Sequence, residues 1–502
     1  MKKGNSVIFF SLFLVPVPIA FLTSSNLYVV PVVYGFWLLL FISIFSVITF
    51  QSQIFVAYDY TFKLINREFK GKIICFVTSF NENPRMLLTT LLSVKNANPS
   101  GETWLLDDST DPEIVSRLKG ICEKLDVPFI HRDNRRGFKA GAINDALKMV
   151  SNDYELLTVF DSDQIPTPRF FSGITGYFSN PKIAFVQIPQ TYTDLPTRIS
   201  KAAYFQQEVF LRKIMRGRSD YSAFILGSGF VARISALESV GGFYEDSVTE
   251  DLATSIKLHE KGWLSAYIDT SEIWYGKAPE TISAYLKQQG RWSLGGFQTM
   301  GPLLRSNIST KQFVDYFAGF LYWLWVGPIR LISLFAMIFF LIFHLYTVFI
   351  NPIFFAIFYF PYLIYSLLFY AYTVSDRSMD YKTRGFMYHQ GAELLLMFTV
   401  TSSFIAFILR RKRPFVVTPK GQAGSYSFGQ AIPFIMIELI VTAAFSAGLV
   451  WLRYAFIPLL RIAIYLNLFF ALYLIPFLIA GSVILFTSDF KPSENFLLRR
   501  EE

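Results

Sequence analysis

Residues 72–77 have the sequence KIICFV, a short apolar run of residues that favour β-strands. A helical pattern follows at residues 84–97 and begins with Pro84, which suits the first turn of a helix. Further strands are predicted at residues 103–106, 128–131 and 156–160, and further helices at 111–124 and 140–150. Because strands and helices alternate, the fold class predicted here is α/β, with a mainly parallel sheet flanked by helices.

The composition of the chain differs strongly between this α/β stretch and its surroundings. Of 502 residues, 53% are hydrophobic and 54 are phenylalanine, most of them before residue 60 or after residue 313. Such a chain is too apolar for an ordinary cytosolic enzyme. Basic residues at 2–3, 410–413 and 499–500 lie next to hydrophobic runs, as the positive-inside rule expects. The net charge of +9 therefore does not require a nucleic-acid partner.

Six apolar runs are predicted to span a membrane with a hydrocarbon core of roughly 30 Å. They lie at residues 7–22, 29–50, 317–350, 353–374, 431–452 and 462–486. The first run is short and follows Lys2 and Lys3, so a signal peptide is the alternative there. A further run at residues 392–409 is placed in the membrane interface, because the basic cluster after it then stays cytoplasmic. The alternative is that this run crosses the membrane.

These features divide the chain into four parts. Residues 1–55 hold two transmembrane helices, 56–300 a cytoplasmic catalytic domain, 301–490 interfacial helices, four transmembrane helices and a loop at about 412–424, and 491–502 a cytoplasmic tail. The predicted location is the plasma membrane, with the lipid bilayer as a partner. Cys75 and Cys122 form no disulfide framework, and the four histidines show no metal-ligand spacing.

Acidic motifs follow two of the predicted strands. They are Asp107-Asp108-Ser109 and Asp161-Ser162-Asp163. In open α/β sheets, ligands bind at the carboxyl ends of the strands. Two carboxylates at D-x-D spacing can hold a divalent ion that grips both phosphates of a nucleotide sugar. Ordinary turns with local side-chain hydrogen bonds are the alternative for both motifs.

Three further motifs carry candidate functional side chains. Lys139 stands among glycines at a helix start, where it is either a solvated lysine or a cation near a diphosphate. Glu250 and Asp251 precede a predicted helix and either cap it or, for Asp251, supply a general base. Arg291 and Trp292 are either an interfacial pair or a phosphate-binding group beside a flat apolar face for a sugar.

Together and in this order, the motifs resemble those of processive family 2 glycosyltransferases, particularly cellulose synthase-like enzymes. The motifs are Phe80-Asn81-Glu82, Asp107-Asp108-Ser109, KAGAIN at 139–144, Asp161-x-Asp163, Thr249-Glu250-Asp251 and Gln288-x-x-Arg291-Trp292. The similarity extends to residues 185–187, 189–190, 227–229 and 277–281, and to the sequence FVVTPKG at 415–421, which is similar to the family's gating loop. The resemblance covers roughly residues 70 to 490. Phe80 stands where tyrosine is more usual, so any hydroxyl contact is lost there.

The resemblance implies a GT-A fold and an inverting, β-forming transfer with Asp251 as the base. Nucleotide-sugar contacts are implied for Glu82, Asp108, Lys139, Asp161, Gln288 and Arg291. Asp161 and Asp163 would hold Mg²⁺ or Mn²⁺. Acceptor-binding roles are implied for Trp292, Gly227, Ser228 and Glu250, and gating-loop roles for Phe415, Val417, Thr418 and Lys420.

The function expected from the motifs is transfer of a hexose from a nucleotide sugar to a growing β-linked polysaccharide, which leaves through the transmembrane bundle. UDP-glucose is the expected donor, while GDP-mannose and UDP-N-acetylglucosamine remain open. The alternatives are a single-transfer enzyme acting on a lipid carrier or glycolipid, and a non-enzymatic transporter. The tail after residue 488 is too short for a regulatory nucleotide-binding module, so activation by a cyclic dinucleotide is not expected.

Overall fold

A computed structural model of the chain describes residues 69–192, 195–219, 221–270, 274–345, 370–376, 380–411 and 428–486, with a few single residues between 45 and 65 and at 364 and 367. Several predicted features lie wholly or largely outside these residues. They are the spans at 7–22, 29–50 and 353–374, the loop at 412–424 with its four gating residues, and the tail.

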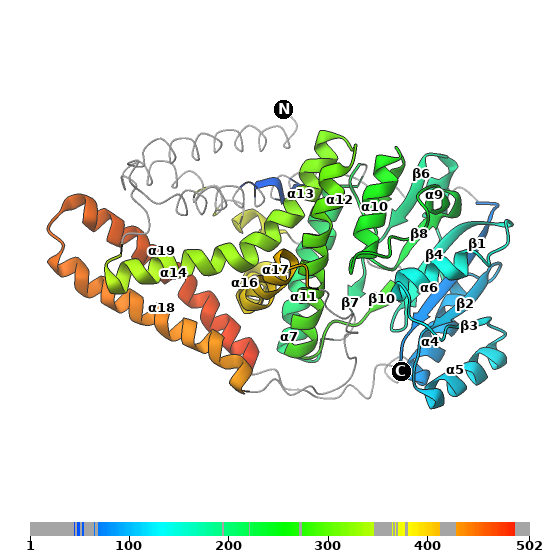
Figure 1. Cartoon of the computed structure of the whole chain (residues 1–502), viewed down its shortest axis with the longest axis horizontal. Helices are drawn as coiled ribbons and strands as arrows, with labels where there is room; N and C mark the ends of the chain where they lie inside the picture. The colour runs from blue at the N-terminus through cyan, green and yellow to red at the C-terminus, as the bar shows by residue number, and fades with distance from the viewer. Residues whose placement is uncertain are drawn as a thin grey trace.

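A seven-stranded sheet forms the centre of the α/β domain (Figure 1). Its strand order is β3-β2-β1-β4-β8-β6-β9. The strands are β1 (Lys72–Ser79), β2 (Glu102–Asp107), β3 (Phe129–His131), β4 (Tyr154–Asp161), β6 (Ile183–Gln187), β8 (Phe230–Arg233) and β9 (Leu264–Tyr267). Only β8 runs antiparallel to its neighbours β4 and β6. The sheet is therefore mixed and mainly parallel, as the strand–helix alternation predicts.

Two layers of helices bury the two faces of this sheet. In β1, Cys75 and Val77 point to one face, and Ile74 and Phe76 to the other, because side chains alternate along a strand. The first face packs on α4 (Pro84–Ala97) and α5 (Pro112–Leu125). The second packs on α6 (Phe138–Leu147), α9 (Ile234–Ser239) and α10 (Glu250–Glu260). Each fully buried apolar side chain contributes about 1.5–3 kcal/mol.

Local signals define where these helices begin and end. Asn83 and Asp111 cap α4 and α5 through their side-chain oxygens, and a proline follows each of them. After α5 the chain turns at Asp126, whose φ of 51° lies in the left-handed region. The predicted helix at 84–97 is confirmed to the residue, and the one predicted at 111–124 is shifted by a single position.

A small second sheet lies beside the first and follows the D-x-D motif. It pairs β10 (Trp274–Gly276) with β5 (Ile165–Pro166) on one side and β7 (Thr191–Tyr192) on the other. The Gln190 side chain packs against Gly276, where an added Cβ atom would stand 1.4 Å from its Nε2 and would force that side chain to move. This second sheet was not predicted, because strands of two or three residues leave no hydrophobic pattern in the sequence.

Three long helices in the described part of the chain are apolar enough to cross a membrane. The first is Thr310–Phe343, made of α13 (Thr310–Leu324), the π-helical turn η3 (Trp325–Ile329) and α14 (Arg330–Phe343). The others lie in α18 (Phe428–Tyr454) and α19 (Pro458–Phe486), which form a hairpin away from the sheet (Figure 1). Three of the six predicted spans thus correspond to helices of sufficient length.

The segment predicted as one interfacial helix, residues 392–409, is broken in the structure. It covers the end of α16 (Lys382–Leu395) and all of α17 (Met397–Ile408), and the two helices meet at a bend of 44°. Together they have the length of one broken span or of a re-entrant pair. The packing constraint at α16 is tight, since a Cβ on Gly391 would stand 2.9 Å from the Gly481 nitrogen of α19.

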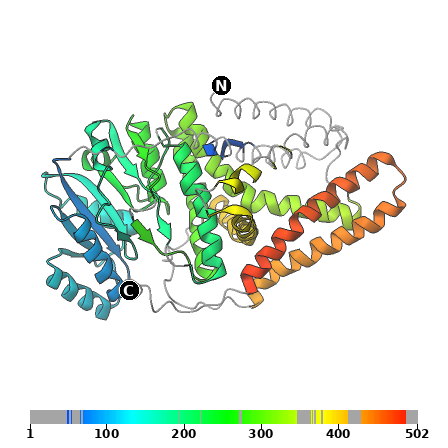
Figure 2. The same ribbon diagram turned by 180° about the vertical axis from the view of Figure 1, so that it is seen from behind.

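Two helices of the α/β domain belong to the same hydrophobic core as the membrane helices. They are α7 (Arg198–Val209) and α11 (Ile282–Gln298). Ile199 and Ala203 of α7 and Tyr285 and Phe297 of α11 are buried among side chains of α13, α14, α16 and α17. Figure 2 shows both helices between the sheet and the bundle. The catalytic domain and the membrane helices are therefore one packed unit.

A chain of polar side chains runs through this shared core. Tyr285 donates to Gln206 Oε1 at 2.6 Å, and Gln206 Nε2 lies 3.5 Å from the hydroxyl of Tyr322. That hydroxyl donates to Glu393 Oε1 at 2.8 Å, and Glu393 Oε2 pairs with Arg330 at 3.0 Å. Arg330, an intramembrane charge in the sequence, is thus paired, as charges within a bilayer generally are.

Candidate active site

The strand order creates a crevice between β1 and β4. From β1 the chain proceeds outward to β2 and β3 and then returns to the other side of β1 with β4. When the connections that follow two neighbouring parallel strands run to opposite sides, a gap remains at the carboxyl ends of these strands. Ligands bind at this position in such sheets. Thr78 near the end of β1 is paired with Asp161 at the end of β4. The D-x-D motif therefore begins at the crevice.

Lys139 and Asp161 form an ion pair in this crevice. The Lys139 ammonium donates to Asp161 Oδ1 at 2.5 Å and to the carbonyl oxygen of Gly227 at 2.8 Å. Ser228 donates to Asp161 Oδ2 at 3.2 Å, and Gln164 donates to Ser228 Oγ at 2.8 Å. Two positions that the motifs single out, Lys139 of α6 and Ser228 of the segment before β8, thus contact the carboxylate at the end of β4.

The segment before β8 reaches the site because of a glycine and a buried glutamine. Gly227 has φ of +83°, a conformation that L side chains rarely adopt, and a Cβ there would stand 3.3 Å from Asp251 Oδ2. Gln187 is fully buried; it accepts from Leu226 N at 2.9 Å and donates to the carbonyl of Ser228 at 3.1 Å. Gln187 belongs to a motif of the resemblance, but it carried no predicted role.

Asp251 lies in the first turn of α10, close to Gly227. Its Oδ1 accepts from the backbone nitrogen of Leu252 at 2.8 Å, so the capping interpretation is partly met. Burial, followed by the negative charge of Glu250, raises the pKa of Asp251 to about 7. Burial also raises the pKa of Glu250, although the positive charges of Lys139 and Arg291 act to lower it. A carboxylate with a pKa near 7 suits a general base at neutral pH.

The carboxyl ends of β2 and β3 hold the second acidic motif. Asp107 accepts from Ser109 at 2.6 Å and contacts His131 Nδ1 at 2.9 Å. Asp108 is held by Arg132 through two parallel bonds, from Nε at 2.8 Å and from Nη2 at 2.7 Å. Such a bidentate pair fixes the orientation of the carboxylate. Asp108, predicted to contact the nucleotide, therefore already has a cationic partner.

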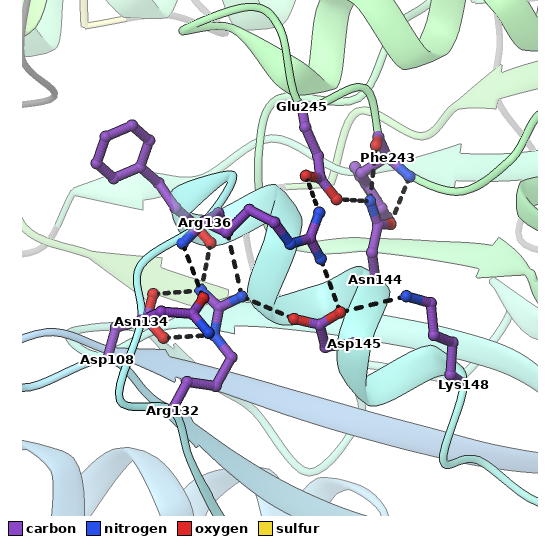
Figure 3. A network of polar contacts seen from close by, with 10 residues as sticks. Asp108, Arg132, Asn134, Arg136, Asn144, Asp145, Lys148, Phe243 and Glu245 are labelled. Atoms are coloured by element: carbon purple, nitrogen blue, oxygen red, sulfur yellow. Dashed lines mark hydrogen bonds and ion pairs between the residues drawn. The ribbon is translucent and has the colours of Figure 1, made fainter.

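Arg132 also begins a wider network that sequence reasoning missed (Figure 3). It donates to Asp145 of α6 at 3.0 Å, and Asp145 in turn accepts from Arg136 at 2.8 Å. Arg136 further pairs with Glu245, which accepts from Asn144 at 2.9 Å. The network ties the loop after β3 to α6 and to the segment before α10. In the sequence, the three arginines within residues 132–136 are the feature that could have indicated this network.

Helix α11 brings the Gln-x-x-Arg-Trp motif to the membrane side of the site. Gln288, Arg291 and Trp292 are each half-buried. Arg291 lies close enough to affect the ionisation of both Glu250 and Asp251. Among the described residues, no group pairs with the buried Oε1 of Gln288. The helix itself is held by α17, whose Ser403 donates to the carbonyl of residue 290 at 3.1 Å.

The carboxylates at the end of β4 suit a hard divalent cation. Asp163 follows Asp161 by two residues and is half-buried, and both offer the oxygen ligands that Mg²⁺ or Mn²⁺ accept. The ammonium of Lys139 already stands against Asp161, so the carboxylate accommodates a cation. In the described part of the chain no three His, Cys, Asp or Glu side chains gather around one point. Phosphate oxygens of a ligand would complete the coordination.

The structure brings part of the predicted site together. Lys139, Asp161, Gly227, Ser228 and Asp251 are linked by the distances above, and Arg291 lies within electrostatic reach of Asp251. Glu82 follows β1 at the same edge of the sheet and is half-buried. The assigned role of each residue remains a prediction.

Comparison with known proteins gives the class of this domain. Residues 156–374 match the family described as Glycosyl transferase family group 2. The chain therefore contains a family 2 glycosyltransferase domain, as its motifs predict.

Curated relatives point to one branch of that class. The chain is 30% identical to "Cellulose synthase catalytic subunit [UDP-forming]" of Xanthomonas axonopodis pv. citri over 270 residues, which are 50% of this chain and 36% of that protein. It is 26% identical to "Cellulose synthase 2" of Novacetimonas hansenii over 391 residues, 74% of this chain and 24% of that protein. The chain thus spans about a quarter to a third of the length of these relatives.

Among solved structures, the mannosyltransferase PcManGT from Pyrobaculum calidifontis, in complex with GDP-Man and Mn2+, is similar with a TM-score of 0.47 at 14% identity. The match covers 74% of this chain and 100% of that one. S. aureus TarS matches with a TM-score of 0.35 at 14% identity, over 50% of this chain and 43% of that one.

Proposed function

We propose that this protein transfers a hexose from a nucleotide sugar, with inversion, to the end of a growing β-linked polysaccharide, and that the polymer leaves through the membrane bundle. The observation that carries the proposal is the convergence of Lys139, Asp161 and Asp251 at the crevice between β1 and β4. The GT-A assignment from the motifs and the domain's family 2 match support it.

Asp251 is assigned the role of general base. The acceptor hydroxyl oxygen attacks the anomeric carbon of the donor, and the bond from that carbon to the diphosphate oxygen breaks. The proton of the hydroxyl passes to the Asp251 carboxylate, which is suited to accept it by a pKa near 7. One displacement at one carbon inverts its configuration, so an α-linked donor gives a β-linked product.

The cationic side chains near Asp251 are assigned to the leaving diphosphate. Lys139 stands at the crevice and Arg291 on the neighbouring face of α11, so both can approach negative charge as it develops. Glu82, Asp108 and Gln288 are assigned to the rest of the nucleotide sugar. When bound at Asp161 and Asp163, Mg²⁺ or Mn²⁺ would neutralise phosphate charge.

The acceptor is assigned to the side of the site that faces the membrane helices. Trp292 offers an apolar face to a sugar ring. Acceptor-binding roles are also assigned to Gly227, Ser228 and Glu250. The gating residues Phe415, Val417, Thr418 and Lys420 lie in the segment that follows α17 in the chain. In this arrangement the domain faces the cytoplasm at the plasma membrane.

The proposed donor is UDP-glucose, with GDP-mannose and UDP-N-acetylglucosamine as alternatives. The printed name "UDP-forming" of the curated relatives supports a uridine nucleotide. Purified protein should be offered each labelled donor in turn, with linkage analysis of the product. A long β-linked polymer from one donor is the expected result.

The same experiment separates the two rival functions. A single-transfer enzyme would give only labelled lipid or short products, whatever the reaction time. A transporter without enzymatic activity would leave all donors intact. Either result would overturn the proposal.

A further inference from the structure

Arg135 lies on the ring of Phe80 at the carboxyl edge of the sheet. Its guanidinium carbon stands 3.5 Å from the centre of the Phe80 ring and 5.3 Å from that of Phe138. Phe80 directly follows β1, and Arg135 belongs to the loop after β3. The stack therefore reaches across the end of β2, where Asp108 lies. A guanidinium over an aromatic face is a favourable cation–π arrangement.

The two neighbouring arginines of this loop are used differently. Arg132 donates to Asp108, to Asp145 and to the backbone carbonyls of residues 136 and 138. Arg136 pairs with Asp145 and Glu245 (Figure 3). The backbone carbonyl of Arg135 accepts from Phe138 N at 3.0 Å. Among the residues that the structure describes, none forms a hydrogen bond or ion pair with its guanidinium group, and the buried Nε has no acceptor there. A guanidinium has five N–H donors, so an unpaired one at a ligand crevice is costly unless a ligand or water accepts them.

The position of Arg135 indicates which part of a nucleotide sugar it would meet. The diphosphate is assigned to the β1–β4 crevice, where Lys139 and Asp161 lie. The nucleoside must then extend from that crevice over the ends of β1, β2 and β3, because α10 and α11 occupy the opposite side near Asp251. Phe80 and Arg135 stand at those strand ends.

We propose that Arg135, held by Phe80, recognises the donor's nucleobase and selects bases with an oxygen, rather than an amino group, at C4 of a pyrimidine or C6 of a purine. This inference rests on the proposed function and assigns to one side chain the selection of uracil or guanine, the bases of the donors proposed above. A guanidinium can only donate, so a carbonyl oxygen satisfies it and an amino group does not. Arginine pairs in this way with O6 and N7 of guanine in nucleic-acid complexes. Phe80 provides the aromatic face on which the Arg135 guanidinium stacks. Unlike tyrosine, it has no hydroxyl that would compete with Arg135 for the base.

The test compares four nucleotides on the full-length protein in detergent or nanodiscs with Mg²⁺. Dissociation constants of UDP, CDP, GDP and ADP are measured by calorimetry. The wild type should bind UDP more tightly than CDP, and GDP more tightly than ADP, by about tenfold, as expected when a charged donor is left unpaired. Arg135→Met should bring both ratios close to one, and Arg135→Lys should give intermediate ratios.

A matched control is Arg117→Met, which removes an exposed arginine of α5 whose one ion-pair partner among the described residues is Glu113. It should leave both ratios unchanged. Phe80→Leu removes the stacking face and should lower the ratios without changing any charge, so it tests the proposal if Arg135→Met does not fold. Wild-type ratios near one, or unchanged ratios in a folded Arg135→Met protein, overturn the inference alone. Failure of all four nucleotides to bind overturns the proposed function as well.

Discussion

Gly295 of α11 lies directly against Thr249, the residue that precedes Glu250 and Asp251. A Cβ atom on Gly295 would stand 2.3 Å from Thr249 Cγ2 and 2.4 Å from its Oγ1. Real Cβ atoms do not approach neighbours so closely, and Thr249 is not the end of a long flexible side chain. The absence of a side chain at this position therefore sets the distance between the Gln-x-x-Arg-Trp helix and the proposed base.

The first prediction concerns this contact. Gly295→Ala should push Thr249, and with it Asp251, away from α11. Since a shift of about 1 Å in a reacting group can cost up to about 100-fold in rate, we expect a large loss in kcat with little change in donor affinity. Steady-state kinetics and nucleotide binding measure the two effects separately. Gly301→Ala in α12 (Met300–Arg305) is the control, because no atom lies within 4 Å of its added Cβ.

The second prediction addresses the base itself. Asp251→Asn keeps the size of the side chain but cannot accept the acceptor's proton. Transfer should fall by about 10²–10⁴-fold, the typical contribution of a general base. Binding of the nucleotide sugar, measured by calorimetry, should remain close to that of the wild type. Polymer synthesis at the wild-type rate would show that another group takes the proton.

The third prediction follows from the raised pKa of Asp251. A base must be ionised to act, so activity should be present above the pKa near 7 and lost as the pH falls through it. Because the charge of Glu250 contributes to the raised pKa, Glu250→Gln should move the inflection of the pH–rate profile to lower pH. The position of the inflection is the readout, whatever the maximal rate of the variant. An unchanged inflection would contradict this electrostatic relation.

Much of the α/β domain could be predicted because its signals are local. The continuous apolar run of β1, which is buried on both faces, and the capped, proline-initiated helices α4 and α5 depend on neighbouring residues only. The antiparallel insertion of β8 between β4 and β6 could not be predicted, since strand pairing depends on distant segments. The membrane helix begins at Thr310 and not at 317, because Ser309 and Gln312 form a polar capping box that hydropathy does not reveal.

The same distinction holds for the candidate site. Asp161 and Lys139 were predicted because they stand at a strand end and at a helix start, and the structure joins them. The pairing of Asp108 with Arg132 was missed, since it links two loops that only the parallel alignment of β2 and β3 brings together. The position of Arg135 on Phe80 depends on the same alignment and on the left-handed backbone at Asn81.

The fourth prediction tests the ion pair in the membrane core. Arg330→Met leaves the carboxylate of Glu393 buried and without its arginine, although Tyr322 still donates to it and His389 Nε2 lies 3.4 Å from its Oε1. Removing one member of a buried pair costs about 3–5 kcal/mol, so the melting temperature of the protein in detergent should drop clearly. The double variant Arg330→Met and Glu393→Met should recover most of this loss. A double variant as unstable as the single one would indicate that the polar chain has a further stabilising role.

The fifth prediction concerns the metal. EDTA should stop turnover, and added Mg²⁺ or Mn²⁺ should restore it, because Asp161 and Asp163 are the proposed ligands. Asp163→Asn should weaken binding of Mn²⁺ in the presence of UDP, measured by electron paramagnetic resonance. Full activity in EDTA would instead assign the neutralisation of the diphosphate to Lys139 and Arg291.

The shared core of α7, α11 and the membrane helices makes bilayer thickness a variable of catalysis. Spanning helices adapt to a thicker or thinner bilayer by tilting. Tyr285 and Phe297 of α11 are buried among these helices, so a tilt is transmitted to the helix that carries Arg291 and contacts Thr249. We therefore expect the turnover rate to change with lipid acyl-chain length even when donor, acceptor and metal are saturating.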